Sequence, residues 1–435
     1  MKKLFLSILL SLIFTSCNSE DDNINSFNNE NNGYIPVIPD TFVLKGTVWS
    51  PGADRNDTLT ENHFPIAGAV VTAWEEMPEL PIPGKCRVCE ALPEDVPSTV
   101  TAHDGSFKLT VAPEKDYYIS VSKGDFFKVT YWRSGTKGNS LKIMGDETAA
   151  KEPMLSLPSE NDPENGKVVP RILIIVGRGE LLMHTLFDSM GMNYGVEYFE
   201  VDDSQAEFIV ANMEELKKYH MIIATCGDEA TYLKKDNVKA NIKQYIREGG
   251  RLYIDDFAYD WAEQIWPEFL TFKVDYTLDY ELGICGSGLT PPPVVGQCVS
   301  YSCYDAQGFV MDSGLNAWLE KVHPYTGLSL RYGCNVLHGL GAGVQGECTN
   351  PESSACVNGN LVAKPKVWLE GSSLYYERLP MTVSWKYYCG RVLYTVYHTH
   401  ASDDNEPHYK LIPQEKIMLY LLFELQKCNT PEIVD

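Results

Sequence analysis

The side chains best suited to chemistry in this chain stand directly after short apolar runs of the kind that form strands. They are one thiol, Cys226, the acidic pair Asp255 and Asp256, and two histidines, His398 and His400. Thiols, carboxylates and imidazoles serve as nucleophiles, as general acids and bases, and as metal ligands. Because ligands of open α/β sheets bind beyond the carboxyl ends of the strands, we expect these groups to share one edge of a sheet.

The catalytic candidates are Asp256, Cys226 and His400, and each has two possible roles. Asp256 could act as a general base, an ester-forming nucleophile or a metal ligand, or it could cap the following helix, whose free N–H groups stabilise a carboxylate. Cys226 would be reactive only if a cation or a helix N-terminus lowered its pKa. Otherwise it is an unreactive, half-buried thiol. His398 and His400 alternate along an extended segment, so they could join Asp256 or Asp403 in a two-histidine, one-carboxylate site for a divalent metal, or lie on a surface loop.

Four polar residues near the same predicted edge are candidates for binding a ligand. They are Arg178, Asp255, Asp260 and His398. Arg178 stands between two glycines after the first apolar run and could grip a carboxylate or a phosphate, although those glycines could serve only a tight turn. A divalent metal is a possible cofactor for these residue types.

The region from about residue 170 onward predicts an α/β domain. Apolar runs alternate there with stretches of helical periodicity, which is the pattern of a parallel sheet covered by helices. A continuous apolar run is typical of a strand buried on both faces. Gly249 and Gly250 end one predicted helix, and Pro413 suits the start of the last one. The predicted strands are 172–176, 196–201, 221–225, 252–254, 382–385 and 392–396, and the predicted helices are 180–190, 238–246 and 414–425.

Two segments of this region resemble the class I glutamine amidotransferase-like superfamily. EGGRLYIDDFAYD, residues 248–260, is similar to its strand-to-elbow segment, and GRVLYTVYHTH, residues 390–400, is similar to the closing strand of its ThuA-like branch. The resemblance covers about residues 170–266 and 380–425. It implies a flavodoxin-like or amidotransferase-like parallel sheet.

Enzymes of that superfamily carry a cysteine at the elbow, which is the sharp turn from a strand into the following helix. They also carry a histidine after a later strand. In this chain the elbow falls on Asp256, and His398 or His400 matches the histidine. The resemblance therefore implies an amidotransferase-like domain whose nucleophilic thiol is missing from its usual place.

Twelve cysteines are many for a cytosolic protein and suit an oxidising compartment. Six of them fall within residues 273–366, which are rich in Gly and Pro. This composition predicts an insertion that is cross-linked by disulfides, which compensate for a small hydrophobic core. If Cys17 carries a lipid, an odd number remains, and Cys226 is the expected free thiol because a residue at a buried strand end is hard to bridge. The disulfide candidates are Cys86, Cys89, Cys285, Cys298, Cys303, Cys334, Cys348, Cys356, Cys389 and Cys428.

Residues 42–157 predict an all-β domain, with turn residues between short runs of β-branched and aromatic residues. Asp104 and Gly105 supply the positive φ of a tight turn. The region resembles the carboxypeptidase regulatory-like domain, which is a β-sandwich, in the order of four segments: GTVWS, PIAGAVVTAWE, TAHDGSFKLTV and YYISVSKGDFF. The resemblance implies a spacer or presenting module without catalytic residues. Cys86 and Cys89 form a CxxC in a Pro-rich loop, where a local disulfide is favoured over a metal pair because further ligands are not obvious nearby. The predicted strands are 43–49, 69–74, 107–111 and 117–121.

The N-terminus predicts export and lipid anchoring. After a short basic start, the apolar run 4–14 is too short to span a bilayer and is typical of a secretory signal peptide. It leads to Cys17 in a segment that resembles a bacterial lipoprotein box, which implies a lipid on that thiol, with simple secretion as the alternative. Residues 18–41 predict a flexible tether. The acidic residues 20–22 resemble the surface-export signal of lipoproteins in the Bacteroidota, with a merely soluble linker as the alternative.

The formal net charge of −23 restricts the partners of this chain. It argues against nucleic acid, whose phosphates require Lys and Arg, and against close contact with anionic lipid, so the lipid on Cys17 is the expected membrane attachment. The predicted organisation is a signal peptide and lipobox at 1–17, a tether at 18–41, an all-β sandwich at 42–157, a linker at 158–169 and an α/β domain at 170–430 that carries the insertion.

Two functions remain open from the sequence. The favoured one is a lipid-anchored, surface-exposed lipoprotein of the outer membrane that binds a glycan or protein ligand through a degenerate amidotransferase-like domain. The alternative is an extracellular hydrolase or metal-dependent enzyme that acts on a glycan or related nutrient, with Cys226, Asp256 and His400 at its centre.

Overall fold

The computed structural model describes most of the chain from residue 40 onward. The described residues are 40–52, 63–85, 95–143, 155–177, 182–227, 230–272, 303–323, 327–334, 337–348, 355–373, 376–399 and 411–427. They belong to one compact unit, Pro39–Asp435. Among the helices in these ranges, none combines the length and the apolar character needed to cross a bilayer. The predictions for Cys17, Cys86, Cys89, Arg178, Cys285, Cys298, His400, Asp403 and Cys428 lie outside the described residues.

The N-terminal half consists of strands in two separate sheets. One sheet has the order β3 (Ser98–Val100), β2 (Val70–Trp74), β5 (Asp116–Lys123), β6 (Phe126–Arg133) and β8 (Lys167–Val168), and the other has the order β4 (Ser106–Val111), β1 (Phe42–Thr47) and β7 (Ser140–Ile143). β4 alternates exposed and buried residues, as expected for a strand with one face on a core. The segment expected as a linker carries the 3₁₀ helix η1 (Pro163–Asn165) and β8, which pairs with β6.

The predicted turn before β4 is present. Gly105 has a φ of 71°, and the backbone N–H of Ser106 donates to Asp104 Oδ1 at 3.0 Å. A Cβ on Gly105 would lie 2.6 Å from Pro65 Cβ, so both the backbone conformation and the space require glycine here.

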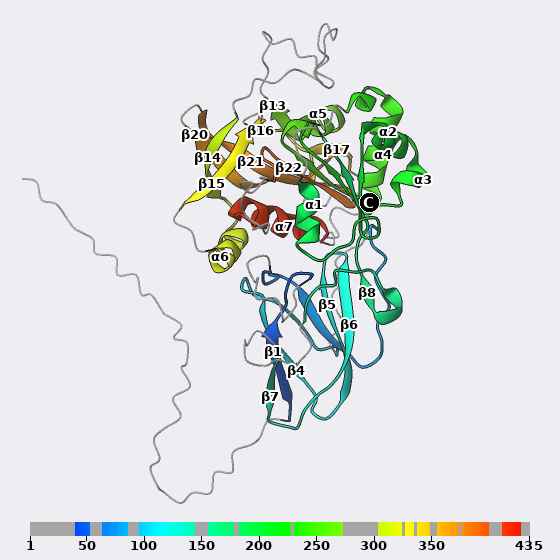
Figure 1. The fold of residues 1–435 in the computed structure, drawn as a ribbon, viewed down its shortest axis with the longest axis vertical. Coiled ribbons are helices and arrows are strands. Elements are labelled where there is room, and N and C mark those ends of the chain that lie inside the picture. Colours follow the sequence, from blue (N-terminus) through cyan, green and yellow to red (C-terminus); the bar gives the residue numbers. More distant parts are fainter. Residues whose placement is uncertain are drawn as a thin grey trace, which may run out of the picture. The chain divides into compact units, whose positions relative to one another are not determined.

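In the described part of the second half, nine strands form one mixed sheet (Figure 1). Its order is β10 (Tyr198–Val201), β9 (Ile172–Ile175), β11 (Met221–Ala224), β12 (Arg251–Asp255), β22 (Gly390–Thr395), β21 (Tyr376–Tyr387), β20 (Lys366–Ser373), β14 (Cys303–Val310) and β15 (Leu328–Cys334). The strands from β10 to β22 are parallel to their neighbours, and each later pair is antiparallel. Every residue of β9, β11 and β12 is buried, which explains their apolar runs.

Short helices connect the parallel strands. α4 buries Val238, Ile242, Tyr245 and Ile246, which confirms the helical spacing read from the sequence. Within the described residues the helix predicted at 180–190 runs from Met183 to Asp188, and the chain then turns at Gly191, where φ is 67°. The helices are α1 (Met183–Asp188), α2 (Asp203–Ala211), α3 (Met213–Leu216), η2 (Thr231–Lys234), α4 (Asp236–Arg247), η3 (Asp256–Tyr259) and α5 (Asp260–Ile265).

The stretch 273–366 is integrated into the main sheet more than the sequence suggested. β14 and β15 both fall inside it, and β14 pairs with β20, so these strands extend the sheet instead of forming a separate insertion. Backbone hydrogen bonding explains why β14 and β15 join the main sheet. The unpaired N–H and C=O groups at the edge of a strand such as β20 offer a template for further strands. The remaining elements are α6 (Ser313–Val322), the pair β13 (Leu270–Phe272) and β16 (Leu337–Leu340), and the small sheet β17 (Val344–Glu347), β19 (Asn360–Val362) and β18 (Cys356–Val357).

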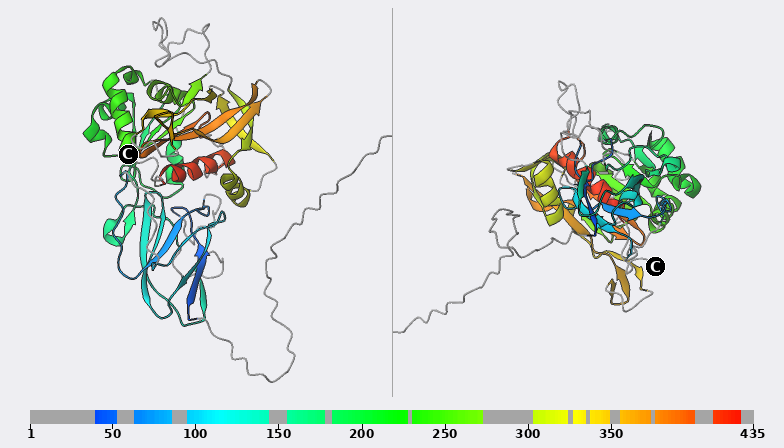
Figure 2. Two further views of the ribbon diagram at one scale, coloured as in Figure 1. Left: turned by 180° about the vertical axis from the view of Figure 1, so that it is seen from behind. Right: turned by 90° about the horizontal axis from the view of Figure 1, so that it is seen from below.

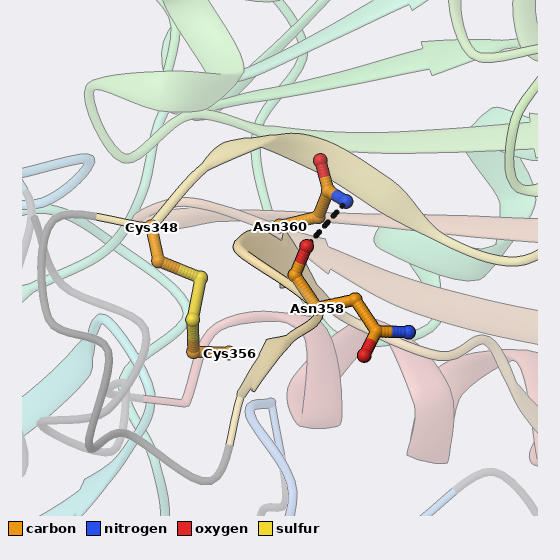
Figure 3. Close-up of a disulfide and its surroundings, with 4 residues drawn as sticks. All are labelled: Cys348, Cys356, Asn358 and Asn360. Carbon is orange, nitrogen blue, oxygen red and sulfur yellow. Dashed lines mark hydrogen bonds between the residues drawn. A yellow bond between two sulfur atoms is a disulfide. The ribbon is translucent and has the colours of Figure 1, made fainter.

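A disulfide closes this small sheet, as the sequence predicted for its cysteines. Cys348 and Cys356 are bonded, and the side chain of Asn360 donates to the carbonyl of Asn358 in the adjoining turn at 3.3 Å (Figure 3). Cys389 is also disulfide-bonded. Among the described residues, Cys226 is the free cysteine, which confirms that prediction.

The last helix, α7 (Pro413–Leu425), joins the two halves into one core. It begins at Pro413, as expected, and contacts β22 and β15 of the mixed sheet (Figures 1 and 2, red). Its Phe423 ring lies 5.1 Å from that of Phe126 and 6.4 Å from that of Phe64, both in the N-terminal half. The N-terminal strands are therefore more than a spacer, because they share apolar core with the second half.

An ion pair is buried at the same junction. Lys123 Nζ lies 2.6 Å from Glu424 Oε1 and donates to the carbonyl of Ala67 at 2.8 Å. Burial pushes the pKa of Glu424 upward, but the charges of Lys123 and Lys427 outweigh burial and lower this pKa. At Lys123 burial outweighs the attraction of Glu424 and lowers the pKa to about 8. Both groups are therefore mostly charged at neutral pH.

We expect Glu424→Gln to lower the free energy of unfolding by about 1.5–3 kcal/mol at pH 7, the usual worth of a hydrogen bond to a charged group. A carboxylate whose folded pKa is lowered adds stability above its unfolded pKa, here near 4.5, and this stability is lost as the pH falls through the folded pKa. The difference between wild type and variant should therefore be full from about pH 5 to about pH 8, shrink below pH 5 as Glu424 gains a proton, and shrink above pH 8 as Lys123 loses one. Urea denaturation at several pH values measures both effects.

The matched control is Glu248→Gln, which removes an exposed pair with Lys217. We expect that variant to change the free energy of unfolding by less than about 1 kcal/mol, as for other surface pairs. A Glu424→Gln effect that stays constant with pH would contradict the role assigned to the buried pair.

Candidate functional site

Three neighbouring parallel strands deliver polar residues to one edge of the mixed sheet. β11 pairs with β12, and β12 pairs with β22, with Ala224 opposite Ile254 and Asp255 opposite Thr395. Because these strands end at the same level, the residues just beyond them meet there. This confirms the prediction that the strand ends share one edge.

The residues that meet are Cys226, Asp256 and His398. The thiol of Cys226 donates to Asp256 Oδ2 at 3.4 Å, and His398 Nε2 lies 3.7 Å from the same oxygen. One potential ligand atom from each of the three residues lies within 4.8 Å of the other two. Cys226 is 4% exposed and Asp256 1%, whereas the side chain of His398 is 16% exposed. The cluster is therefore buried, with its imidazole nearest the surface.

Asp256 is the first residue of the 3₁₀ helix η3, directly after β12, and its backbone is strained. Its φ is 39°, in the left-handed region that aspartate adopts at a cost. The N-cap position of η3 is Asp255, whose side chain makes no cap hydrogen bond, and the carboxylate of Asp256 faces Cys226 and His398. Strained strand-to-helix turns of this kind place the nucleophile in many α/β enzymes, and here the turn holds a carboxylate.

The thiol of Cys226 has the opposite electrostatic environment from an activated nucleophile. Burial raises its pKa strongly, and the carboxylates of Asp256 and Asp255 raise it further, with only a small opposing effect from the backbone N–H of Phe257. The condition set by the sequence, a nearby cation or helix N-terminus that lowers this pKa, is not met. The thiol is protonated at neutral pH and serves as a hydrogen-bond donor.

Buried polar residues hold His398 in place. Gln414 Nε2 donates to the carbonyl of His398 at 2.8 Å, and Gln414 Oε1 accepts from the backbone N–H of Arg331 at 2.7 Å. The ring nitrogen Nδ1 of His398 lies 2.6 Å from the carbonyl oxygen of Thr399. A carbonyl can only accept, so Nδ1 carries a proton and Nε2 is the atom that faces Asp256.

The backbone of the elbow and of the β22 end is tied down by hydroxyl groups. Tyr394 donates to the carbonyl of Asp256 at 3.1 Å, and Thr395 donates to that of Tyr397 at 2.7 Å. Tyr253 OH lies 2.8 Å from the Thr395 hydroxyl. Sequence analysis missed Gln414 and these hydroxyl residues. Tyr394 and Thr395 within the apolar run of β22 were the available signal for the hydroxyl groups, whereas Gln414 lies among other polar residues at the start of α7 and gave no such signal.

The other predicted site residues divide into two groups. Asp255 is fully buried at the end of β12, and Asp260 is buried at the start of α5, where Gln264 donates to it at 3.5 Å. Neither belongs to the three-residue cluster. Arg178 and His400 lie outside the described residues, so the two-histidine arrangement stays a prediction.

Comparisons with known proteins give only weak likenesses. No protein-family model matches the chain, and no curated protein matches it significantly. A solved structure from Bacteroides uniformis ATCC 8492, described as ThuA-like, matches at 11% identity and a TM-score of 0.32, over 58% of this chain and 91% of that one. A cytoplasmic protein from Salmonella typhimurium matches at 12% identity and 0.31, over 59% and 98%. A β-galactosidase from Rahnella sp. R3 matches at 11% and 0.30, over 61% and 32%. TM-scores this low support no argument about this chain.

Proposed function

We propose that this chain is a lipoprotein of the bacterial cell envelope, attached through a lipid on Cys17, that binds a ligand at the carboxyl edge of its α/β sheet. We further propose that it performs no thiol-based amidotransfer. The observation that carries the proposal is the elbow itself, where Asp256 stands at a φ of 39° and accepts a hydrogen bond from the thiol of Cys226. A carboxylate at the elbow beside a protonated thiol favours binding over covalent catalysis.

The electrostatics of the cluster support this reading. A catalytic thiol is activated by a neighbouring base or cation that lowers its pKa. Cys226 instead has two carboxylates nearby and is buried, and all three influences raise the pKa of the thiol. His398 Nε2 faces the carboxylate of Asp256 at 3.7 Å. A thiol, a carboxylate and an imidazole in one rigid edge nevertheless offer several polar contacts to a ligand.

The N-terminal strands suit a supporting role in such a protein. Their resemblance to the carboxypeptidase regulatory-like sandwich implies a presenting module, and their shared core with α7 would hold the binding edge at a fixed place on the protein. A glycan or protein at the cell surface is the expected ligand. The acidic residues after Cys17 favour outward exposure.

Turnover assays on the full-length lipoprotein test the absence of catalysis. We expect hydrolysis of glutamine, of chromogenic esters and of chromogenic glycosides to be no faster with wild type than with Asp256→Asn. Hydrolysis by wild type that Asp256→Asn abolishes, while leaving the circular dichroism spectrum unchanged, would contradict the proposal and support the hydrolase alternative. In the producing cells, Cys17→Ser should move the protein from the membrane fraction to the soluble fraction.

A further inference from the structure

The three side chains of the cluster are spaced as ligands of one metal ion. Four-coordinate zinc, with bonds of about 2.3 Å to sulfur and about 2.0–2.2 Å to nitrogen and oxygen, holds its ligand atoms about 3.3–3.7 Å apart. The distances from Asp256 Oδ2 to Cys226 Sγ and to His398 Nε2 are 3.4 and 3.7 Å. All three ligand atoms fall within 4.8 Å of one another, so the side chains need only small movements to enclose an ion.

The orientation of His398 points to a cation. Its Nδ1 donates to the carbonyl of Thr399, so in the neutral imidazole the lone pair of Nε2 is directed at the Asp256 carboxylate. A positive charge removes the repulsion between this lone pair and the carboxylate oxygen, and either a proton on Nε2 or a metal ion between the two atoms supplies it. At 3.7 Å the two atoms are also too far apart for a direct hydrogen bond. Histidine ligands of metals commonly donate their other ring N–H to a backbone carbonyl, as His398 does.

The charges and donor atoms of the three side chains indicate which kind of metal ion they would bind. A thiolate and a carboxylate together balance a divalent ion, and a neutral imidazole completes three ligands. The mixture of sulfur, nitrogen and oxygen suits zinc and related transition metals, and does not suit Mg²⁺ or Ca²⁺, which prefer oxygen alone. Asp255 adds a further buried carboxylate close enough to act on Cys226.

We propose that Cys226, Asp256 and His398 bind one zinc-like divalent transition metal. The inference rests on the proposed function in one respect, because it takes Cys226 as a ligand and not as a covalent nucleophile. It deepens that function by placing a metal ion at the binding edge. Gln414, which holds the backbone of His398, is a positioning residue for this site.

Metal titration of the full-length protein tests the site. The protein is first stripped with a chelator without reducing its disulfides, and Zn²⁺ is then added in competition with a chromophoric chelator. We expect one bound equivalent, and a loss of affinity of at least about 100-fold in each of Cys226→Ser, Asp256→Asn and His398→Gln, since even indirect partners of a metal site cost 10–100-fold. Co²⁺ should give a thiolate-to-cobalt charge-transfer band that Cys226→Ser removes.

Asp260→Asn is the matched control, because Asp260 is buried at the same edge but lies outside the cluster. It should retain the charge-transfer band and the zinc affinity. Circular dichroism and thermal unfolding of each variant establish that it is folded, and His398→Gln provides a second test if Cys226→Ser does not fold. Absence of the band, or zinc affinity unchanged in all three variants, would overturn the inference and leave a hydrogen-bonded cluster only.

The two proposals fail in different ways. If no metal binds and no turnover is found, the metal inference is wrong and the binding function stands. If the metal binds as expected and the loaded protein hydrolyses a substrate through Asp256, the metal site stands and the non-catalytic function is wrong.

Discussion

The variant Phe423→Ala is expected to lower the free energy of unfolding by about 3–5 kcal/mol, the usual cost of removing a buried phenylalanine side chain. Phe423 is 3% exposed, and its ring packs against Phe64 and Phe126. The substitution would therefore leave a cavity bordered by both halves of the chain. Since one core connects these halves, we expect a single unfolding transition in wild type and in the variant, shifted to lower denaturant concentration in the latter.

Equilibrium denaturation followed by tryptophan fluorescence and by circular dichroism measures this effect. Phe208→Ala is the control, because Phe208 lies on α2 and is 63% exposed. That substitution should change the free energy of unfolding by no more than about 0.5 kcal/mol. Two separate transitions, with only one displaced by Phe423→Ala, would show that the N-terminal strands fold independently and would contradict the shared core.

The second large effect concerns the reactivity of Cys226. In metal-stripped, folded protein we expect iodoacetamide to label this thiol at least about 100-fold more slowly than in denaturant, because burial and two carboxylates suppress the thiolate that reacts. Peptide mapping of the non-reduced protein after timed labelling identifies the site. The rate should stay low from pH 6 to about pH 8.5, where a free cysteine would begin to ionise.

A reference thiol makes the comparison quantitative. Phe208→Cys in a Cys226→Ser background places a thiol at a position where the wild-type side chain is 63% exposed, and we expect it to react at the rate of an ordinary cysteine. Rapid labelling of Cys226 near neutral pH would mean that its pKa is lowered and not raised. That result would favour the enzyme hypothesis over the binding function.

Particular elements show how far the sequence could predict the fold. The uninterrupted apolar run of β9 marked a strand buried on both faces, and the spacing of Val238, Ile242 and Ile246 marked α4. These patterns are local, because periodicity reports which faces of an element are buried. The positions of β14 and β15 were not predictable in this way, since strand pairing across long separations leaves no local trace.

The candidate site, like the fold, could be predicted from the sequence only in part. By itself the sequence determined that a thiol, carboxylates and imidazoles follow strand ends, and that Asp255 and Asp256 follow the apolar run 252–254. Only the tertiary structure decided which of them meet: the order β11, β12, β22 places Cys226, Asp256 and His398 together, and leaves Asp260 outside the cluster. The structure also decided the state of the thiol, because a pKa depends on burial and on neighbouring charges that come together only when the chain is folded.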